Sequence, residues 1–482
     1  MEVLKTTLPL KHIAVSSILA LVLGYAIFRY EVMVLAVLSA LVVLFFFGRM
    51  IYLKPMYGLY TTLIVSFFVN GIIRYLDLPL GLGVDLLLFF SIIIALFSRE
   101  KPAVSNLNSS LLWISIIWLG FTVLEIFNPE ATSKVAWFYA VRAVSIYQIL
   151  SVFFLLLYLK DKKQVYYFTH LTLICCLVAS FWGFKQIFLG LDEWEIRWLA
   201  SGPIRTHVLF GVLRAFSFLS DSGQFGATMG YGAIVAFLLA LGPFSARKRV
   251  ILALIGFICL YAMALSGTRG AFFVVIGGAL AYLISTKNLK SIAVGGVFLL
   301  GIFMFLKFTT IGNENYQLRR MRTALNPKDA SLQVRLENQL KFKQYLATRP
   351  LGGGIGTSGS WGQRFSPNTF LANTPNDSWY VRIWAETGII GLTLHVIMIL
   401  YILFKGFAVT FSLNDPMLRQ YMMALNSGFA GIAVAAYGNP IIGQFPINII
   451  IYFTWGAIFL AANMDKPQKH LAGADNPVLP TG

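Results

Sequence analysis

Long runs of apolar residues, separated by short polar connections, occupy most of this chain. A helix that crosses a lipid bilayer needs about 20 mostly apolar residues. By this measure the pattern predicts an all-α, polytopic integral membrane protein with about 12–14 transmembrane helices. The candidate spans are centred near residues 20, 39, 66, 89, 118, 148, 177, 233, 258, 278, 299, 394, 427 and 454.

Composition supports the same class of protein. Of the 482 residues, 58% are hydrophobic and only 12% are charged, whereas a soluble domain carries about 25% charged residues. Cys175, Cys176 and Cys259 lie inside apolar runs without metal-ligand spacing, so we interpret them as packing residues. The first apolar run is not followed by a small-residue cleavage site, which favours a retained span over a signal peptide.

The distribution of Lys and Arg predicts how the spans are oriented. Basic stretches precede the odd-numbered spans, for example KDKK at 160–163 and ARKR at 246–249, and the intervening connections are poorer in charge or much longer. Because short cytoplasmic loops are enriched in Lys and Arg, both termini are expected inside. The formal net charge of +18 is then explained largely by the Lys and Arg residues of the predicted cytoplasmic loops. Since no basic soluble domain carries this charge, we expect no nucleic-acid partner.

Two outer segments, at about 189–222 and 308–380, are longer than simple turns. Long connections in compact folds usually carry function. Between Lys307 and Tyr380, ten Lys or Arg residues outnumber four acidic residues, a net charge of +6. This excess indicates an anionic ligand, and the alternative is a solvated basic surface near lipid headgroups.

The second outer segment contains a predicted amphipathic helix, DASLQVRLENQLKFKQYLATRP at 329–350. Asp329 or Ser331 is expected to cap its start, and its Arg-Pro pair to mark its end. Arg335 lies at the margin of the apolar stripe. The stripe consists of Leu332, Leu336, Leu340 and Leu346 at helical spacing.

A glycine-rich stretch, RPLGGGIGT at 349–357, follows this helix. Its glycines permit a close approach of the backbone, and we expect its amides to receive an oxyanion. It is not a nucleotide-binding P-loop, because the Lys-Ser/Thr ending is absent.

An arginine interrupts the apolar stretch LSGTRGAFFVVIGG at 265–278. The predicted topology places Arg269 in an outer turn between two spans, where a charge beside a water-filled cavity is tolerated. The alternative is an arginine that extends to lipid headgroups. Asp85, Glu125 and Arg142 also interrupt predicted spans, and a structural pair between Arg142 and one of these acids is expected.

Two further polar motifs precede predicted spans. RAFSFLSDSGQFG at 214–226 begins with Arg214, and NTPNDSWYVRIWAETGIIGL at 373–392 contains Asp377 and Glu386. An alternative role for Glu386 is to cap a helix N-terminus, where a carboxylate is favoured.

Taken in order, these motifs resemble the O-antigen ligase and O-antigen polymerase superfamily of bacterial cell-envelope enzymes. The motifs are the Ser-Gly-Thr-Arg-Gly turn, the outer segment with an arginine-bearing helix, RPLGGGIGT, and the polar motif that runs into AETGIIGL. The resemblance divides the chain into three parts. These are N-terminal transmembrane helices at 1–204, a ligase- or polymerase-like core at 205–405 with a periplasmic loop at 308–380, and C-terminal helices with a short cytoplasmic tail at 406–482.

Members of this superfamily resemble C-class glycosyltransferases. The resemblance therefore implies an enzyme of the bacterial inner membrane, surrounded by membrane lipids, that needs no metal, nucleotide sugar or other cofactor and faces the periplasm. The implied donor is a polyprenyl-diphosphate-linked glycan, and the implied acceptor is a sugar hydroxyl of lipid A–core, as for a ligase, or of another carrier-linked glycan, as for a polymerase. Family arginines that contact the donor diphosphate correspond to Arg269 and Arg335, with Arg214 as a third candidate.

The chain departs from ligases of this superfamily at the position of the proposed base. Those ligases usually carry a His-Asn pair shortly before E-x-G-x-x-G, whereas this chain reads Pro375-Asn376-Asp377-Ser378 there. Asp377 is therefore the first candidate for the general base and Glu386 the second. Ligase and polymerase activities both stay open.

The alternative function is a lipid-linked glycan flippase or another polysaccharide transporter. Such transporters often contain related halves and a site at the membrane midplane. This sequence shows no evident internal repeat, and its ionisable residues gather near one predicted face. The pattern therefore favours the enzyme.

Overall fold

The computed structural model describes residues 32–76, 81–286, 289–311, 313–314, 316–323, 326 and 328–465. The predicted span near residue 20, with its expected retention, lies outside the described residues. Each of the other predicted centres falls within a helix. The described chain contains one two-stranded antiparallel pair besides its helices, so the all-α class is confirmed.

The first half of the chain forms a series of helices broken by short irregular turns. The helices are α2 (Val32–Leu53), α3 (Met56–Ile72), α4 (Gly81–Leu96), α5 (Ser110–Leu124), α6 (Lys134–Val141), α7 (Tyr147–Tyr158), α8 (Lys162–Phe184), α9 (Glu193–Ala200) and α10 (Ile204–His207). Between them lie η1 (Val104–Asn108), η2 (Glu125–Phe127), η3 (Arg142–Ile146) and η4 (Lys185–Leu189).

The second half begins after a short hairpin that sequence analysis did not predict, β1 (Val208–Leu209) and β2 (Val212–Leu213). Its helices are α11 (Ser222–Ala240), α12 (Ala246–Leu265), α13 (Arg269–Ser285), α14 (Leu289–Phe308), α15 (Tyr316–Thr323), α16 (Ala330–Leu346), α17 (Gly359–Phe365), α18 (Phe370–Asn373), α19 (Trp379–Ser412), α20 (Pro416–Ala435) and α21 (Ile447–Met464).

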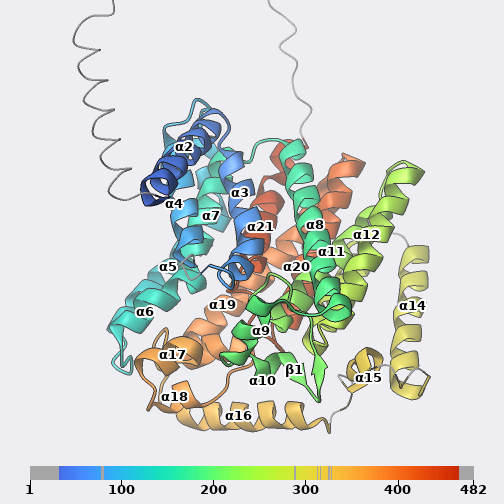
Figure 1. Ribbon diagram of the computed structural model, residues 1–482. Helices are drawn as coiled ribbons and strands as arrows, with labels where there is room; N and C mark the ends of the chain where they lie inside the picture. The colour runs from blue at the N-terminus through green and yellow to red at the C-terminus, as the bar shows by residue number, and fades with distance from the viewer. Residues whose placement is uncertain are drawn as a thin grey trace, which may run out of the picture.

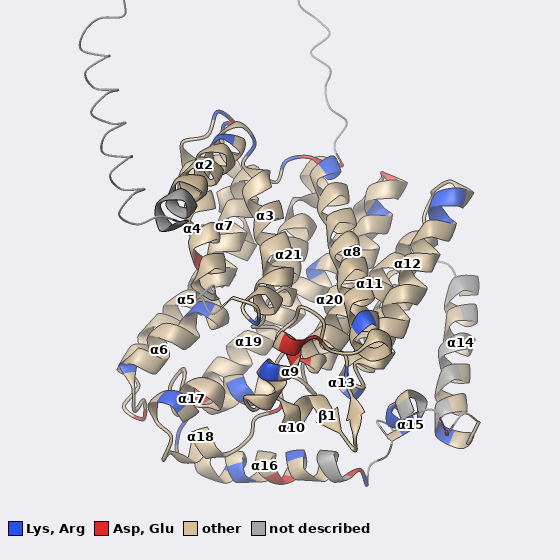
Figure 2. Cartoon of the chain, viewed as in Figure 1, with Lys and Arg blue, Asp and Glu red and all other residues tan. Residues whose placement is uncertain are grey.

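The length and composition of these helices identify a multi-pass membrane protein. Within the described residues, 7 helical stretches are long and apolar enough to cross a membrane, and four shorter apolar helices accompany them. The total number of helices that cross the bilayer, and their orientation, stay predictions. Basic side chains lie in the connections at the end opposite α16 (Figure 2), as the predicted alternation requires.

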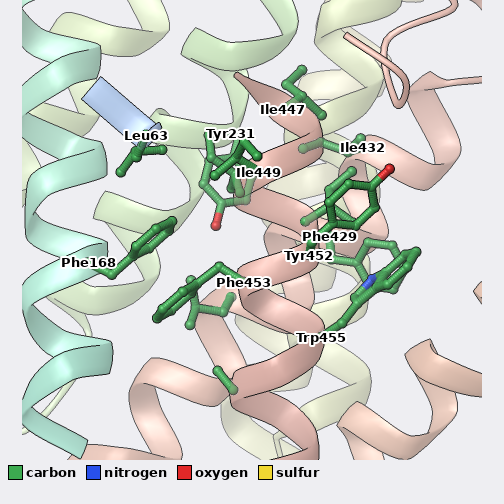
Figure 3. Close-up of a cluster of buried hydrophobic side chains, with 14 of the residues drawn as sticks. Leu63, Phe168, Tyr231, Phe429, Ile432, Ile447, Ile449, Tyr452, Phe453 and Trp455 are labelled. Carbon is green, nitrogen blue, oxygen red and sulfur yellow. The ribbon is translucent and has the colours of Figure 1, made fainter. Parts of the chain in front are cut away.

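Helix α21 forms the centre of the bundle and packs against α3, α7, α8, α19 and α20 (Figure 1). It is apolar on all sides, as expected of a helix that other helices surround. Phe453 and Trp455 are at most 1% exposed. In Figure 3 Phe453 lies against Phe168 of α8, and Trp455 lies beside Phe429 of α20.

The pair α13 and α20 approaches unusually closely. A Cβ atom added at Gly431 of α20 would lie 2.1 Å from the carbonyl oxygen of Val274 in α13. Small residues at such contacts let transmembrane helices pack backbone to backbone. This packing sets the distance between Arg269, at the start of α13, and the residues that follow the end of α20.

Both long outer segments lie at one end of the bundle, where α16 crosses beneath the other helices (Figure 1). Asp329 caps α16 by accepting a hydrogen bond from the Leu332 amide, as one of the two predicted caps. Of the predicted apolar stripe, Leu346 is buried together with Phe342 against the start of α19 and Leu371, whereas Leu336 and Leu340 are exposed.

Candidate functional site

A cavity of about 470 Å³ lies between α16 and the helical bundle. Its walls come from five parts of the chain: the start of α13, the connection that precedes α16, α16 itself, residues 375–378 with the start of α19, and the end of α20. Arg269, Arg335 and Asp377 all line it. The structure thus brings together three of the five candidate site residues, from segments that are spread over more than a hundred positions of the sequence.

Arg269 is the first residue of α13, directly after the turn that the sequence motif predicted. One of its terminal nitrogens lies 2.5 Å from a carboxylate oxygen of Asp329 and 3.5 Å from the Thr323 hydroxyl. Both members of the ion pair are largely shielded, with side chains 18% and 17% exposed. Asp329 therefore performs two tasks, because its other oxygen caps α16.

The turn before Arg269 is held by two other arginines. Gly267 has φ +56°, a left-handed conformation that favours glycine. Arg214 donates to the Ser266 carbonyl at 2.9 Å and to the Thr268 hydroxyl at 2.7 Å, and Arg320 donates to the Gly267 carbonyl at 2.8 Å. Arg214 is outside the cavity lining, so its geometry supports a role in fixing the turn.

Arg335 and Asp377 face each other across the cavity. Arg335 Nε lies 3.4 Å from a carboxylate oxygen of Asp377, and their side chains are 33% and 55% exposed. Arg335 projects from α16, while Asp377 lies in the connection immediately before α19. Asn338, one turn further along α16, donates to the Pro375 carbonyl at 3.4 Å and holds this connection in place.

Three helix N-termini converge on the cavity. Arg269 begins α13, Asp329 caps α16 and Ser378 caps α19, and all three residues line the cavity. The N-terminus of a helix carries a partial positive charge and favours anions. The cavity thus combines these termini with two guanidinium groups and the two carboxylates that pair with them, those of Asp329 and Asp377.

The end of α20 completes the site with residues that sequence analysis did not select. Tyr437 lines the cavity and donates its hydroxyl to the Gln339 side chain of α16 at 3.3 Å. A Cβ atom added at Gly438 would lie 3.9 Å from a terminal nitrogen of Arg335. These contacts lie within the predicted C-terminal part, 406–482, and so the cavity is shared between it and the predicted core.

Glu386 lies outside the cavity lining and is fully buried. It accepts a hydrogen bond from the Ser358 hydroxyl at 2.6 Å and pairs with Arg382 at 3.2 Å. Asn376, in the cavity wall, donates to the same hydroxyl at 2.8 Å. Glu386 therefore joins the glycine-rich stretch to α19, and it reaches the cavity only through Ser358 and Asn376.

The glycine-rich stretch packs closely, as predicted, but the structure gives its amides partners other than an oxyanion. The amides of Gly352, Gly353 and Gly354 donate to the carbonyls of Arg349, Ala385 and Glu386, each at 2.9 Å. Their partners are main-chain oxygens because the stretch is buried against α19 where that helix bends at Gly388 (φ +63°). The expected oxyanion cradle is not formed by these amides.

The charges inside predicted spans separate into two groups. Arg142 pairs with Asp85, which also accepts from the Tyr147 hydroxyl, so the expected structural pair is confirmed. Glu125 instead accepts from Asn128, which also donates to the Leu351 carbonyl. Neither group lines the cavity.

The two histidines closest in sequence to the motifs also lie away from the cavity. His395 is buried within α19 and accepts from the Trp379 indole at 2.9 Å. His207 is buried beside β1, and its Nδ1 lies 2.9 Å from the Pro203 carbonyl oxygen. Burial lowers the pKa of His207, while this hydrogen bond opposes the shift. The described cavity wall therefore offers a carboxylate, Asp377, where ligases of the resembled superfamily carry histidine.

The fold defines a polytopic membrane protein, and a cavity lined by two Arg–Asp ion pairs lies at one end of its helical bundle. Residues 254–396 match the model of the O-antigen ligase family. The chain is also 31% identical, over 191 residues, to an O-antigen polymerase of Salmonella muenchen. These comparisons support the resemblance, since this part of the chain is similar to the O-antigen ligase family and to an O-antigen polymerase.

The similarity to the Salmonella protein covers 39% of this chain and 46% of that protein, so the chain spans about half the length of the curated relative. The family match includes the turn with Arg269, the whole second outer segment and the first half of α19. Arg214 and the end of α20 lie outside the matched residues.

Proposed function

We propose that this protein transfers a glycan from a polyprenyl-diphosphate carrier to a sugar hydroxyl during the synthesis of a cell-envelope polysaccharide, as an O-antigen polymerase or ligase does. The observation that carries the proposal is the cavity in which Arg269 and Arg335 converge with three helix N-termini. The proposed site faces the periplasm from the inner membrane.

The two arginines bind the donor diphosphate and stabilise it as it leaves. Guanidinium groups stay protonated and hold phosphate oxygens through paired hydrogen bonds. Departure of the diphosphate places additional negative charge on the bridging oxygen, and fixed donors in a sheltered site stabilise such charge strongly. This stabilisation removes the need for a metal ion at the leaving group.

Asp377 removes the proton from the acceptor hydroxyl. The hydroxyl oxygen then forms a bond to the anomeric carbon of the donor sugar, and the bond between that carbon and the diphosphate oxygen breaks with its electron pair on the diphosphate. Direct displacement inverts the configuration at the anomeric carbon. Inversion requires Asp377 to act on the face of the anomeric carbon opposite the diphosphate, so the donor sugar is expected to enter between Asp377 and Arg335, which lie 3.4 Å apart in the structure.

The test is transfer by the purified protein in nanodiscs supplied with a carrier-linked glycan. Wild type is expected to form a new glycosidic bond, and removing either cavity arginine (R269A or R335A) is expected to lower the rate about 100- to 1,000-fold. The matched control is R99A, because Arg99 is exposed in the connection after α4, outside the cavity. All variants should insert into membranes equally.

Normal product from both cavity variants would contradict the diphosphate-binding role. Translocation of the glycan lipid across a vesicle membrane without a new bond would instead identify a transporter. Labelling of cysteines introduced at 269 and within 308–380 tests the orientation separately. Cytoplasmic accessibility of these positions would exclude a periplasmic site.

A further inference from the structure

A second polar and aromatic surface lies at the same end of the molecule as the cavity, where α17 meets α6 (Figure 1). Tyr139 of α6 stacks on Trp361 and Phe365 of α17, with ring centroids 5.0 and 5.6 Å apart and planes within 19°. Trp361 and Phe365 are also nearly parallel, 6.1 Å apart. We call these three rings the aromatic shelf.

A guanidinium group borders the aromatic shelf. Arg364 is exposed, and its guanidinium carbon lies 5.4 Å from the centre of the Phe365 ring and 6.0 Å from that of Trp361. None of the three rings is fully buried. The shelf is therefore a partly exposed group of stacked rings next to a cation with five hydrogen-bond donors.

This combination matches the chemistry of a carbohydrate. A pyranose ring has an apolar face of C–H groups, which carry a partial positive charge and pack against the negative face of an aromatic ring. Its edge is lined with hydroxyl groups, or with a carboxylate in a uronic acid, which a guanidinium group binds. A stack of parallel rings suits successive sugar units of a chain.

The aromatic shelf is connected to the cavity by short contacts. Helix α17 begins directly after Ser358, whose hydroxyl accepts from Asn376 in the cavity wall at 2.8 Å. A Cβ atom added at Gly359, the first residue of α17, would lie 3.9 Å from the Asn376 side-chain oxygen. The aromatic shelf and the cavity are therefore close neighbours, joined through Ser358 and Asn376.

We infer that Tyr139, Trp361, Phe365 and Arg364 form a glycan-binding subsite for sugar units beyond the reacting residue. The inference rests on the proposed function for the identity of the ligand, because the cavity supplies the diphosphate end and the shelf binds the sugars. The competing role is an aromatic belt at the membrane surface, where Trp and Tyr are enriched. The two roles predict different ligands for the same rings.

Binding of a glycan without its lipid distinguishes these roles. The probe is the polysaccharide released by mild acid from the surface of cells that produce this protein, titrated calorimetrically into protein in nanodiscs. Replacing the tryptophan ring (W361A) or the cation (R364A) is expected to weaken binding about tenfold, and W361F should recover most of the affinity. The matched control is W113A, because Trp113 is a 58% exposed tryptophan on α5 and outside the shelf.

R364A keeps the test decisive if W361A unfolds, because the exposed Arg364 side chain contributes little to packing. Unchanged affinity in R364A and in folded W361A, together with quenching of Trp361 fluorescence by brominated lipids, would overturn the subsite in favour of the membrane belt. The fluorescence of Trp361 is obtained as the difference between wild type and W361F.

Failure of the subsite and failure of the proposed function give different results. The binding assay is repeated in the R269A background, which lacks a cavity arginine but keeps the shelf. Glycan binding that persists there and falls in R364A supports the subsite even if transfer is never observed. Transfer with normal product length in R364A, and unchanged glycan affinity, would remove the subsite and leave the proposed function intact.

Discussion

Two groups of charged residues at the same end of the molecule have similar composition but opposite surroundings. In the cavity, Arg269 pairs with Asp329 and Arg335 pairs with Asp377, and all four side chains line an open volume. Behind it, Arg382 pairs with Glu386, whose side chain is 0% exposed and also accepts from Ser358. We call this second group the buried brace.

The comparison shows why residue type alone does not identify a catalytic group. A buried carboxylate that accepts several hydrogen bonds stabilises the fold, and breaking such a pair is strongly destabilising. A carboxylate such as Asp377, with a side chain 55% exposed beside a cavity and an exposed ion pair to Arg335, contributes little to stability and is accessible to a substrate. Substitutions in the buried brace should therefore lower stability, and the substitution of Asp377 should lower activity, when both quantities are measured on the same variants.

The largest expected effect is the loss of stability on removing the carboxylate of the buried brace. E386A leaves Arg382 and the Ser358 hydroxyl without their acceptor in a buried environment, which costs about 3–5 kcal/mol. Thermal unfolding in detergent should show a clear decrease in Tm. The control E386Q keeps an acceptor for Ser358 and should recover part of the loss. A fully stable but inactive E386Q would assign the base to Glu386 instead.

The next effect is a loss of activity without a loss of stability at Asp377. D377N keeps the size of the side chain but cannot accept the acceptor's proton, and we expect transfer to slow by about 100-fold or more. The Tm should match that of wild type, because the carboxylate is exposed. Rate and Tm are measured on the same preparation. Wild-type turnover in D377N would exclude Asp377 as the base.

Sequence patterns located most of the helices and three residues of the cavity. The helices could be predicted from apolar runs of span length, because a membrane span is identified from its own residues and does not depend on contacts with distant segments. Arg269 was found because a charge in an apolar run is unusual, and Arg335 and Asp377 because the motif order resembles a known superfamily. The N-cap of α16 by Asp329 followed from local capping chemistry.

The remaining features depend on contacts between distant segments. Sequence spacing could not show that Asp329 pairs with Arg269, because that contact depends on how α16 crosses the bundle. The contribution of Tyr437 depends on the close packing of α13 on α20. The glycine-rich stretch looked like an anion cradle because its residues allow one, but α19 supplies carbonyl partners that occupy the amides.

A smaller effect is expected where an arginine holds the turn without lining the cavity. R214A removes donors to the Ser266 carbonyl and the Thr268 hydroxyl, so the turn that carries Arg269 becomes less well positioned. Since misplacing a catalytic group by about 1 Å costs up to 100-fold, we expect transfer to slow by about tenfold. Steady-state kinetics should show the change mainly in kcat. A loss as large as that of R269A would instead indicate direct contact between Arg214 and the diphosphate.

The smallest expected effect is on the affinity of the cavity for the donor diphosphate, because Asp329 and the diphosphate compete for Arg269. D329N keeps an N-cap for α16, since Asn caps as well as Asp, but removes the competing charge. A partly exposed ion pair contributes about 0.2–1 kcal/mol, so binding of a glycan-free polyprenyl diphosphate should tighten up to about fivefold. Ligand-dependent Tm shifts measure this affinity.

The control D329A also loses the cap and should lower stability by about 1 kcal/mol. Weaker diphosphate binding in D329N would mean that Asp329 orients Arg269. The ion pair between these two residues would then have a structural role, like that of the buried brace.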